Sequence, residues 1–255
     1  MIALPRTVRR AVVPVGLVVL WEVLARTGAI DARMTSSPAE IVASLLDMLA
    51  TGELSEHLSI SLFRAVVGLA AGAALATVAG TVAGLSRLGE DAVDSVIQAI
   101  RTLPYLGMVP LFILWFGLGE APRITMVALG SFFPVYLNVF KGIRGVDARL
   151  VDLGRGYRVS RWEMIRDVVV PGAMPSALVG LRYALGTAWM SLVVAEQINA
   201  QSGLGYLIVQ ANTLAQTSII ITALAIYAVI GIAADAIVRL IERRALRWRL
   251  AFEGV

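Results

Sequence analysis

Few side chains in this sequence could carry out chemistry, and their types exclude most enzyme classes. The 255 residues include no cysteine and one histidine, His57. A disulfide scaffold, a thiolate zinc site and a cysteine nucleophile are therefore excluded. A single histidine leaves little for metal binding or Ser-His chemistry, and we expect it to be a solvated loop residue. The acids within the apolar segments are isolated, so paired-carboxylate catalysis is not expected.

Two charged residues that interrupt apolar segments, Arg182 and Glu196, are candidates for a translocation path or gate. A guanidinium matches an oxyanion with paired donors, so Arg182 could contact an anionic head group transiently. The favoured alternative is a structural role, either in an ion pair with an acid such as Glu196 or Asp94 or by snorkelling to the inner membrane surface. Glu196 could belong to an outer gate or be a solvated helix end, and the sequence favours neither.

The composition predicts an integral membrane protein. Hydrophobic residues make up 58% of the chain, charged residues make up 16%, and the mean hydropathy is +0.79. Soluble domains carry roughly 25% charged and 45–50% apolar residues. The net charge of +4 does not indicate nucleic-acid binding, because the basic residues lie between long uncharged runs. It indicates membrane topology.

Six apolar stretches approach the length of about 20 residues that a helix needs to cross a bilayer. They predict an all-α protein whose transmembrane helices lie near residues 10–28, 60–86, 93–116, 121–141, 171–198 and 216–241. Glu22 and Arg101 shorten the first and third stretches. The first is expected to remain as an uncleaved span, because Glu22 and Arg26 occupy the place of a small-residue cleavage site.

The distribution of Lys and Arg predicts an N-in/C-in orientation. The N-terminal segment has three basic residues and no acid, residues 141–167 have seven basic residues, and the tail from Arg239 has five. Residues 29–59 hold five acids and one arginine. Because positive charge is retained on the cytoplasmic side, both termini and residues 141–167 are expected there. An even number of spans agrees with this orientation.

Glycine and proline positions suggest how the spans pack and bend. Two small-xxx-small spacings allow close helix approach, and packing within one subunit is favoured over a dimer contact, at Gly68, Gly72, Gly80 and Gly84. Kinks are expected in the third and fourth spans, at Pro104, Pro110 and Pro134.

The outer segment 38–54 predicts an amphipathic helix. Ser36 or Ser37 can cap it, with Pro38 at its first position. Apolar residues recur at helical spacing between Glu40 and Asp47. A packing role is favoured over a binding role.

The cytoplasmic segment 141–167 is long and also has a helical pattern. An interrupted apolar stripe runs among its arginines, formed by Leu150, Leu153, Tyr157 and Trp162. Ser160 and Glu163 have the spacing of a capping box, which restarts a helix that runs to Pro171. Such a pair of short helices could rest on anionic lipid or enter a groove in a soluble partner, and the pattern alone favours lipid.

The same segment resembles the coupling motif of ABC importer permeases: Glu-Ala-Ala, three residues, Gly, nine residues, Ile, one residue, Leu-Pro. Asp152 stands at the position of the Glu, Gly154 at that of the second Ala, and Pro171 closes the motif. Two departures are the bulkier Leu153 and Arg158, which replaces the motif glycine. Glycine there permits a turn between two short helices.

The resemblance covers nearly the whole chain and is to the branch that imports aliphatic sulfonates, taurine and nitrate. Supporting strings are Ser-Leu-Phe-Arg at 61–64, Phe-Pro-Val-Tyr at 133–136, Pro-Gly-Ala-Met-Pro at 171–175 and Ser-Gly-Leu-Gly-Tyr at 202–206. The run at 171–175 and the final string at 241–248 are most similar to the aliphatic sulfonate permeases.

The resemblance implies a type I ABC importer permease fold in a multi-pass protein of the bacterial plasma (inner) membrane. Residues 1–59 would carry the first span and the external helix, and residues 60–255 the permease core with the coupling loop 141–167. The chain would be a translocation subunit and not an enzyme. It lacks the GxxxxGK[ST] loop, so ATP and Mg would be held by the partner ATPase, and no cofactor or metal by this chain.

The implied partners are two cytoplasmic ABC ATPase subunits, a second permease copy in a homodimer, an extracellular or periplasmic substrate-binding protein and membrane lipid. Residues 150–162 would form a coupling helix in a groove of the ATPase, with Tyr157 or Trp162 as anchor. The residues assigned to coupling are Leu150, Asp152, Leu153, Gly154, Arg155, Tyr157, Arg158, Ser160, Arg161, Trp162 and Pro171.

The function implied is ATP-driven import of a small organic anion, first among them the aliphatic sulfonates. Importers of taurine, nitrate or bicarbonate with the same architecture are the alternative, because the binding protein supplies most of the specificity. A passive channel or membrane scaffold would suit the composition, but would not need the basic helical segment 141–167.

Overall fold

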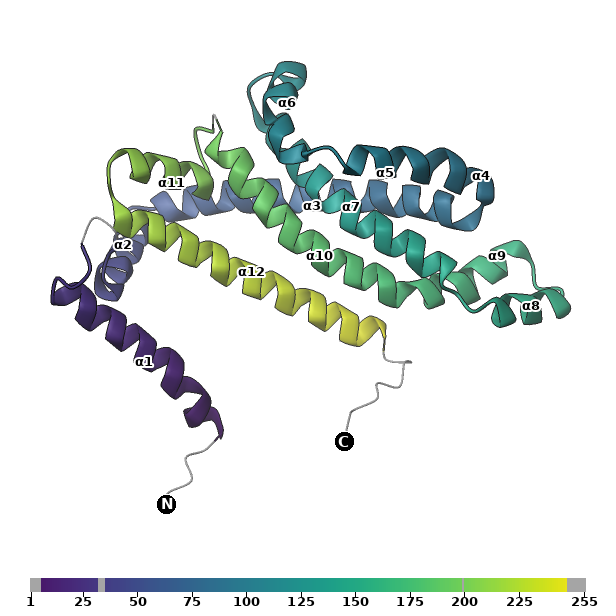
Figure 1. Cartoon of the computed structure of the whole chain (residues 1–255), viewed down its shortest axis with the longest axis horizontal. Helices are drawn as coiled ribbons and strands as arrows, with labels where there is room; N and C mark the ends of the chain where they lie inside the picture. Colours follow the sequence, from purple (N-terminus) through teal and green to yellow (C-terminus); the bar gives the residue numbers. More distant parts are fainter. Residues whose placement is uncertain (1–5, 32–34, 199, 247–255) are drawn as a thin grey trace. The chain divides into compact units, whose positions relative to one another are not determined.

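The structure is a computed structural model that describes residues 6–31, 35–198 and 200–246. These ranges fold into helices and contain no β-strand (Figure 1). The chain forms two compact units, one of Met1–Ile60 with Ala200–Ala228 and one of Ser61–Asn199 with Val229–Val255. Two of the three boundaries between the units fall within long helices, α3 (Glu53–Leu85) and α12 (Thr217–Ala245), and the third falls between residues 199 and 200.

The first unit contains the amphipathic helix that the sequence predicts. Besides the first turns of α3 and α12, the helices of this unit are α1 (Arg6–Arg26), α2 (Pro38–Ala50) and α11 (Leu204–Thr213). Ser37 caps α2 by accepting from the Glu40 amide, and its own amide donates to the Glu40 carboxylate. This capping box and Pro38 confirm the predicted start. The helix ends earlier than expected, at Ala50, because Gly52 takes a φ of +81° and α3 begins at the next residue.

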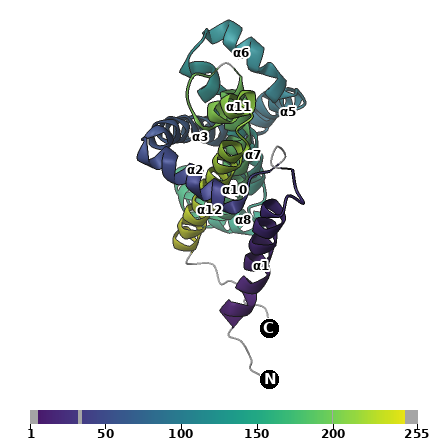
Figure 2. The ribbon, with the colours of Figure 1, turned by 90° about the vertical axis from the view of Figure 1, so that its left-hand side faces the viewer.

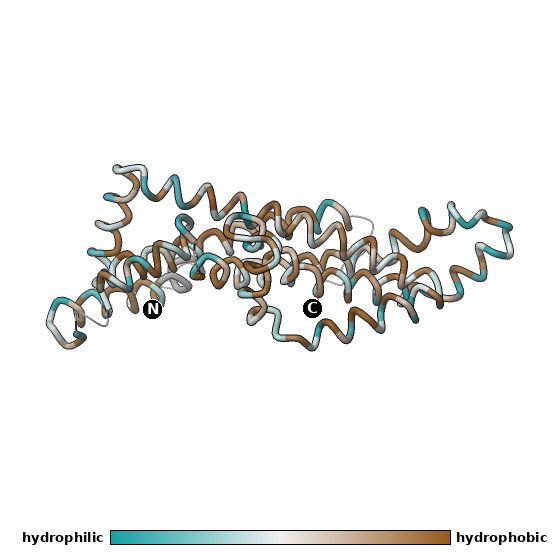
Figure 3. Tube along the Cα trace, turned by 90° about the horizontal axis from the view of Figure 1, so that it is seen from above, coloured by the Kyte–Doolittle hydropathy of each residue, from teal (hydrophilic) through white to brown (hydrophobic). Residues whose placement is uncertain are grey.

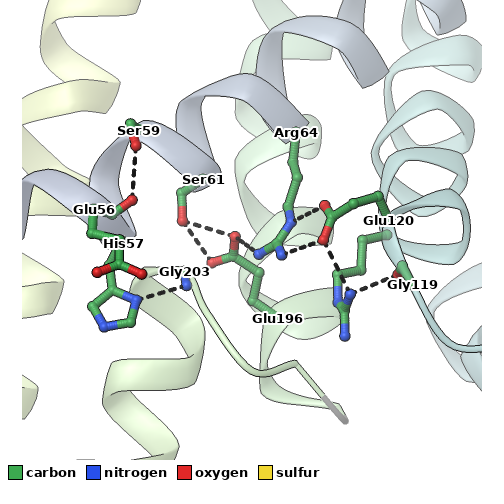
Figure 4. Close-up of polar contacts among 10 residues, drawn as sticks. Glu56, His57, Ser59, Ser61, Arg64, Gly119, Glu120, Glu196 and Gly203 are labelled. Atoms are coloured by element: carbon green, nitrogen blue, oxygen red, sulfur yellow. Dashed lines mark hydrogen bonds and ion pairs between the residues drawn. The ribbon is translucent and has the colours of Figure 1, made fainter.

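His57 lies within this unit, and the expectation that it is solvated is wrong. The residue is 9% exposed, its Nδ1 accepts a hydrogen bond from the amide of Gly203 at 3.0 Å, and its ring centre lies 5.8 Å from that of Tyr206. The loop before α11 is therefore fastened to α3 through the single histidine (Figure 4). This contact joins residues 146 positions apart, which a local pattern does not reveal.

The second unit is a bundle whose core lies where α3, α5, α7 and α10 meet. Its helices, with the remaining parts of α3 and α12, are α4 (Arg87–Gly89), α5 (Ser95–Arg101), α6 (Val109–Phe116), α7 (Glu120–Arg144), α8 (Ala148–Gly156), α9 (Arg161–Glu163) and α10 (Val170–Gln197). Tyr136 and Ala184 are fully buried at the centre of this core. Figure 1 shows α7 and α10 side by side along their lengths.

The four glycines of α3 let this helix approach α7 closely. A Cβ on Gly68 would lie 2.6 Å from the Cβ of Val127, and one on Gly84 would lie 2.8 Å from the Cγ2 of Ile143. Gly72 and Gly80 face α7 in the same way. The prediction that these spacings pack helices within one chain is confirmed.

The third predicted span is broken. The helices over Arg87–Arg101 and Tyr105–Phe116 are bent by 81° at a break that contains Pro104, so α6 turns away from α5 (Figures 1 and 2). Pro110 lies in the first turn of α6, where its missing amide leaves no helical hydrogen bond unmade. The predicted bend is thus confirmed in this span. Pro134, in contrast, lies inside α7, which continues through it.

Four helical segments in the described ranges are long and apolar enough to cross a membrane. They are α3, α7, α12 and the continuous segment Arg161–Gln197, and the bent pair would make a fifth if it forms one span. Hydrophobic colour follows these helices in Figure 3, with more hydrophilic colour where α8 and α9 meet. Helix α1 has 21 residues, but charges near both of its ends leave only residues 11–21 uncharged. Six spans therefore remain a prediction, with α1 as the sixth.

Candidate functional site

A buried arginine joins three helices of the second unit. Arg64 of α3 donates Nε and Nη2 to the two oxygens of Glu120, at 2.5 and 2.7 Å, and Nη1 to Glu196 at 2.8 Å. The Ser61 hydroxyl donates to the Glu196 carboxylate and lies 2.8 and 2.9 Å from its oxygens. Figure 4 shows the guanidinium between the two carboxylates. We call Ser61, Arg64, Glu120 and Glu196 the Arg64 cluster.

The cluster is withdrawn from solvent on one side and open on the other. The side chains of Arg64 and Glu196 are 1% and 0% exposed, whereas that of Glu120 is 47% exposed. A buried charge is tolerated when it is paired and its donors are satisfied. Two parallel bonds to Glu120 also fix the plane of the guanidinium. The cluster therefore links α3, α7 and α10 through Arg64, and its Glu120 carboxylate on α7 is exposed to solvent.

Helix geometry explains how the sequence places these groups together. Ser61 and Arg64 are three residues apart and so lie on one face of α3. Glu120 lies in the first turn of α7, where a negative charge is favoured by the helix dipole. Glu196 lies in the last turn of α10. One turn into α7, Arg123 donates to the Gly119 carbonyl at 2.6 Å.

The structure decides between the two interpretations of Glu196 in part. The residue is buried and bonded to Arg64, so the solvated helix end is wrong. A gate role for Glu196 stays a prediction. Sequence reasoning missed Arg64 and Glu120 as members of this cluster. The available signal was the position of Arg64 immediately before the uncharged run Ala65–Ser86, since a cation there needs a partner.

Arg182 forms an ion pair, but with an acid that was not expected. Its Nε donates to Oδ1 of Asp235 on α12 at 2.8 Å. Neither of the two acids suggested from the sequence is its partner: Glu196 binds Arg64, and Asp94 accepts from the Tyr136 hydroxyl at 2.8 Å. Arg182 and Glu196 therefore belong to different clusters.

The residues predicted for coupling form a helical hairpin at the surface of the second unit. Helix α8 is followed by a turn, by α9, and by a π-helical turn (Met164–Val169) that leads into α10. Apolar side chains stand exposed on this hairpin, with exposed fractions of 51% for Leu150, 58% for Leu153, 78% for Tyr157 and 70% for Trp162. Asp152 and Arg155 form an exposed ion pair at 3.4 Å, and Arg161 is also exposed.

The capping signal is confirmed, but two expected boundaries are wrong. Ser160 caps α9 by accepting from the Glu163 amide, and the Glu163 carboxylate accepts from the Ser160 amide. The helix does not end at Pro171: the helical path runs from Arg161 through the π-helical turn Met164–Val169 and past the proline to Gln197, because the wider turn breaks the regular hydrogen-bond pattern just before Pro171. Residues 150–162 are not one helix, since α8 ends at Gly156 and Trp162 belongs to α9.

The hairpin turn keeps a backbone shape that suits glycine although its residue is an arginine. Arg158 has a φ of +57°, in the left-handed region that costs a side-chain-bearing residue about 1 kcal/mol. Its amide donates to the Arg155 carbonyl at 3.0 Å and the next amide donates to Gly154 at 3.0 Å. Gly154 faces the end of the Met164 side chain across the hairpin. The replacement therefore leaves the turn in place.

Comparison with known proteins identifies the family. Residues 68–247 match the family described as binding-protein-dependent transport system inner membrane component. The chain is 42% identical over 241 residues to a Bacillus subtilis (strain 168) protein that carries the name aliphatic sulfonates transport permease protein SsuC, covering 94% of this chain and 87% of the relative. It is 42% identical to the Escherichia coli (strain K12) protein of that name, covering 94% and 91%.

A more distant relative and a solved structure agree with this match. The taurine transport system permease protein TauC of Escherichia coli (strain K12) is 30% identical, with 91% of this chain and 86% of the relative covered. An inward-facing structure of the MetNI methionine ABC transporter shares the fold with a TM-score of 0.55 at 18% identity, covering 75% of this chain and 95% of that one. The chain belongs to the binding-protein-dependent transport system inner membrane components, the permease family of ABC transporters.

Proposed function

We propose that this chain is the membrane-spanning permease subunit of an ATP-driven importer of aliphatic sulfonates. The observation that carries the proposal is the 42% identity, over 94% of the chain, to two proteins named as aliphatic sulfonate permeases. The chain would form the translocation path and couple it to a cytoplasmic ATPase, which holds ATP and Mg. It is a translocation subunit and carries out no catalysis itself.

The proposed arrangement in the bacterial plasma (inner) membrane has six spans with both termini inside, in a type I importer fold. Residues 1–59 contribute the first span, α1, and the external helix α2, and residues 60–255 form the permease core. The exposed apolar side chains of α1, between 50% and 66% from Val12 to Leu20, support its placement against lipid.

The proposed coupling element is the hairpin of α8 and α9. Exposed leucines and aromatic residues on a short amphipathic helix suit a groove on a protein partner, and Tyr157 and Trp162 are of the residue types that anchor interfaces. Asp152 and Arg155 would then exchange their weak mutual pair for contacts with the ATPase. The assembly would hold two such ATPase subunits, a second copy of this permease and an external binding protein.

Taurine is the second candidate substrate, because TauC is 30% identical over most of both chains. Taurine is itself a sulfonate that carries an additional ammonium group. The two candidates therefore share the anionic head group and differ in the rest of the molecule.

Growth on defined sulfur sources tests the proposal. A bacterial host deleted for its own sulfonate and taurine importers would receive this chain with its ATPase and binding protein. We expect growth with ethanesulfonate as sole sulfur source, and none when this chain alone is omitted. Growth on taurine but not on ethanesulfonate would favour the second candidate. No rescue on either sulfonate, with all subunits present in the membrane fraction, would contradict the proposal.

A further inference from the structure

A second charged cluster of the second unit lies within two of the apolar helices. Asp235 of α12 receives Nε of Arg182 on its Oδ1 at 2.8 Å and pairs through Oδ2 with Nη1 of Arg239 at 3.0 Å. We call these three residues the Asp235 cluster. Its side chains are 48% exposed for Arg182, 33% for Asp235 and 47% for Arg239. The cluster thus opens away from the packed core.

The cluster carries one positive charge in excess and has spare donors. Two guanidinium groups share one carboxylate, and each carboxylate oxygen already has one arginine. Within the described residues, Arg182 makes its side-chain hydrogen bond through Nε alone. Its two terminal nitrogens are thus available as a planar pair of donors, the arrangement that binds an oxyanion through two parallel hydrogen bonds.

Arg182 lies well inside an apolar helix, which restricts what its charge can contact. Residues 168–195 contain no other charged side chain, so Arg182 lies near the middle of that apolar stretch, about 20 Å from Val168 at 1.5 Å per residue. A charged residue this deep in a span faces a water-filled cavity or a partner rather than lipid tails. Asp235 and Arg239 lie toward the end of α12 that is proposed to be cytoplasmic, so an anionic lipid head group and an anion that passes through the membrane are the two species to compare. The position of Arg182 well inside the apolar stretch of α10 favours the anion that passes through.

We propose that the Asp235 cluster is a contact site for the sulfonate group of the translocated molecule, with Arg182 as its principal donor and Asp235 as the carboxylate that holds both arginines ready. The inference rests on the proposed function and adds to it the residues that meet the anion. Asp235 keeps the site from binding the anion too tightly to release it, because the carboxylate competes for the same guanidinium groups. Arg182 and Arg239 therefore attract the sulfonate anion, and Asp235 limits how long the site retains it.

Two substitutions that break the same ion pair have different consequences under this proposal. Arg182→Gln removes the principal donor to the sulfonate, whereas Asp235→Asn leaves both donors and removes the carboxylate that positions them and competes with the anion. A purely structural ion pair would make them equally damaging. The measurement is uptake of ³⁵S-ethanesulfonate into liposomes that contain the permease, its ATPase and the loaded binding protein, together with ATP hydrolysis in the same vesicles.

We expect Arg182→Gln to lower uptake per ATP about tenfold, which corresponds to about 1.4 kcal/mol. The loss is smaller than that of two full charge-assisted hydrogen bonds because Arg239 still attracts the anion. Arg239→Gln lowers it in the same direction, and Arg182→Lys recovers part of the loss because it keeps the charge without the planar fork. Asp235→Asn lowers uptake per ATP less, about threefold, because both arginines keep their charge but lose the carboxylate that positions them. Stimulation of ATP hydrolysis by the loaded binding protein stays intact in all four.

Three results would overturn the site alone, and each has a different meaning. Equal loss of uptake or of assembly in Arg182→Gln and Asp235→Asn would make the pair structural. An effect of Arg182→Gln that occurs with phosphatidylglycerol in the vesicles but disappears in pure phosphatidylcholine would assign the cluster to a lipid head group. Unchanged uptake per ATP in Arg182→Gln and Arg239→Gln would exclude contact with the anion. If the unaltered complex imports no ethanesulfonate, the proposed function itself fails, and the site with it.

Discussion

Arg64 and Glu196 are both charged and both removed from solvent, so each depends on the other for its stability in the folded chain. The half-exposed Glu120 holds the second edge of the same guanidinium. A charge of this kind is expensive when its partner is removed, because the remaining group stays buried without compensation. The cluster is therefore a place where single substitutions have large effects.

Arg64→Gln is expected to destabilise the protein by about 3–5 kcal/mol, since Glu196 would be left buried without its cation. Thermal unfolding of the purified chain in detergent measures this. The matched control is Arg26→Gln, which removes an ion pair with Glu22 whose arginine is 70% exposed and should cost no more than about 1 kcal/mol. Similar losses in the two variants would contradict the account of the buried cluster.

Asp152→Lys is expected to abolish transport and leave membrane insertion intact. Asp152 is exposed and paired only weakly with Arg155, so its reversal costs the isolated chain little. In the assembly the new cation would face the groove that the aspartate is proposed to enter. Sulfonate uptake and the amount of chain in the membrane fraction are compared, and normal uptake by this variant would refute the coupling assignment.

For single side chains, the sequence indicates which residue types are unusual for a membrane span but not which of them contact one another. The depth of Arg182 and Glu196 follows from counting along a helix, whereas their direction around the helix axis does not. Asp235 lies 53 residues from Arg182, and Ser61 lies 135 residues from Glu196. Such pairs depend on the packing of whole helices. The partner predicted for Arg182 was therefore wrong, and the Arg64 cluster was not predicted.

At the level of helices, the close approach of α3 to α7 depends on glycine. A Cβ on Gly68 would lie 2.6 Å from the Cβ of Val127 and 3.0 Å from the Ile124 carbonyl oxygen. The backbone oxygen belongs to α7 itself, so it cannot move aside as a flexible side chain would. The two helices must separate to admit a methyl group.

Gly68→Ala is expected to destabilise the protein by about 1–3 kcal/mol through overpacking. Gly186→Ala is its matched control, since a Cβ there meets nothing within 4 Å and alanine favours the helix by about 0.5–1 kcal/mol. The two substitutions should therefore shift the midpoint of thermal unfolding in opposite directions. A shift of the same sign and size in both would argue against close packing at Gly68.

The turn between α8 and α9 provides a second test, of the backbone conformation that joins these two helices. Arg158→Gly should stabilise the turn by about 1 kcal/mol, because glycine adopts a positive φ without the penalty of a side chain. Arg155→Gly, in the helical part of α8, should instead destabilise it by about the same amount. Hydrogen exchange of the amides over residues 148–160 measures both, and faster exchange in Arg158→Gly would contradict the assigned backbone shape.

The helices were more predictable than the side-chain clusters, because apolar length and capping residues act locally. The starts of α2 and α9 follow from Ser37 and Ser160, and the bend near Pro104 follows from a proline within an apolar run. The continuation of the helix through Pro171 was not predicted, because a proline inside a helical path usually ends or kinks it and the sequence does not reveal the π-helical turn that precedes it. The motif that ends at Pro171 suggested a helix end where the backbone continues into α10.

For the whole molecule, the six-span N-in/C-in topology makes a prediction that single cysteines can test, because the natural chain has none. Thr51→Cys should react with a membrane-impermeant maleimide in intact cells after removal of the outer layers. Ile2→Cys and Gly156→Cys should react only after permeabilisation. Labelling of Ile2→Cys from outside would mean an odd number of spans and would remove α1 from the membrane.

We propose that this chain works as the permease of a complex driven by a separate ATPase. The decisive measurement is mild-detergent purification of the tagged chain from its native membrane, with mass spectrometry of the proteins that accompany it. We predict that an ABC ATPase and an external binding protein are recovered with it. Recovery of the intact chain without an ATPase, even after chemical cross-linking in the membrane before extraction, would contradict the claim.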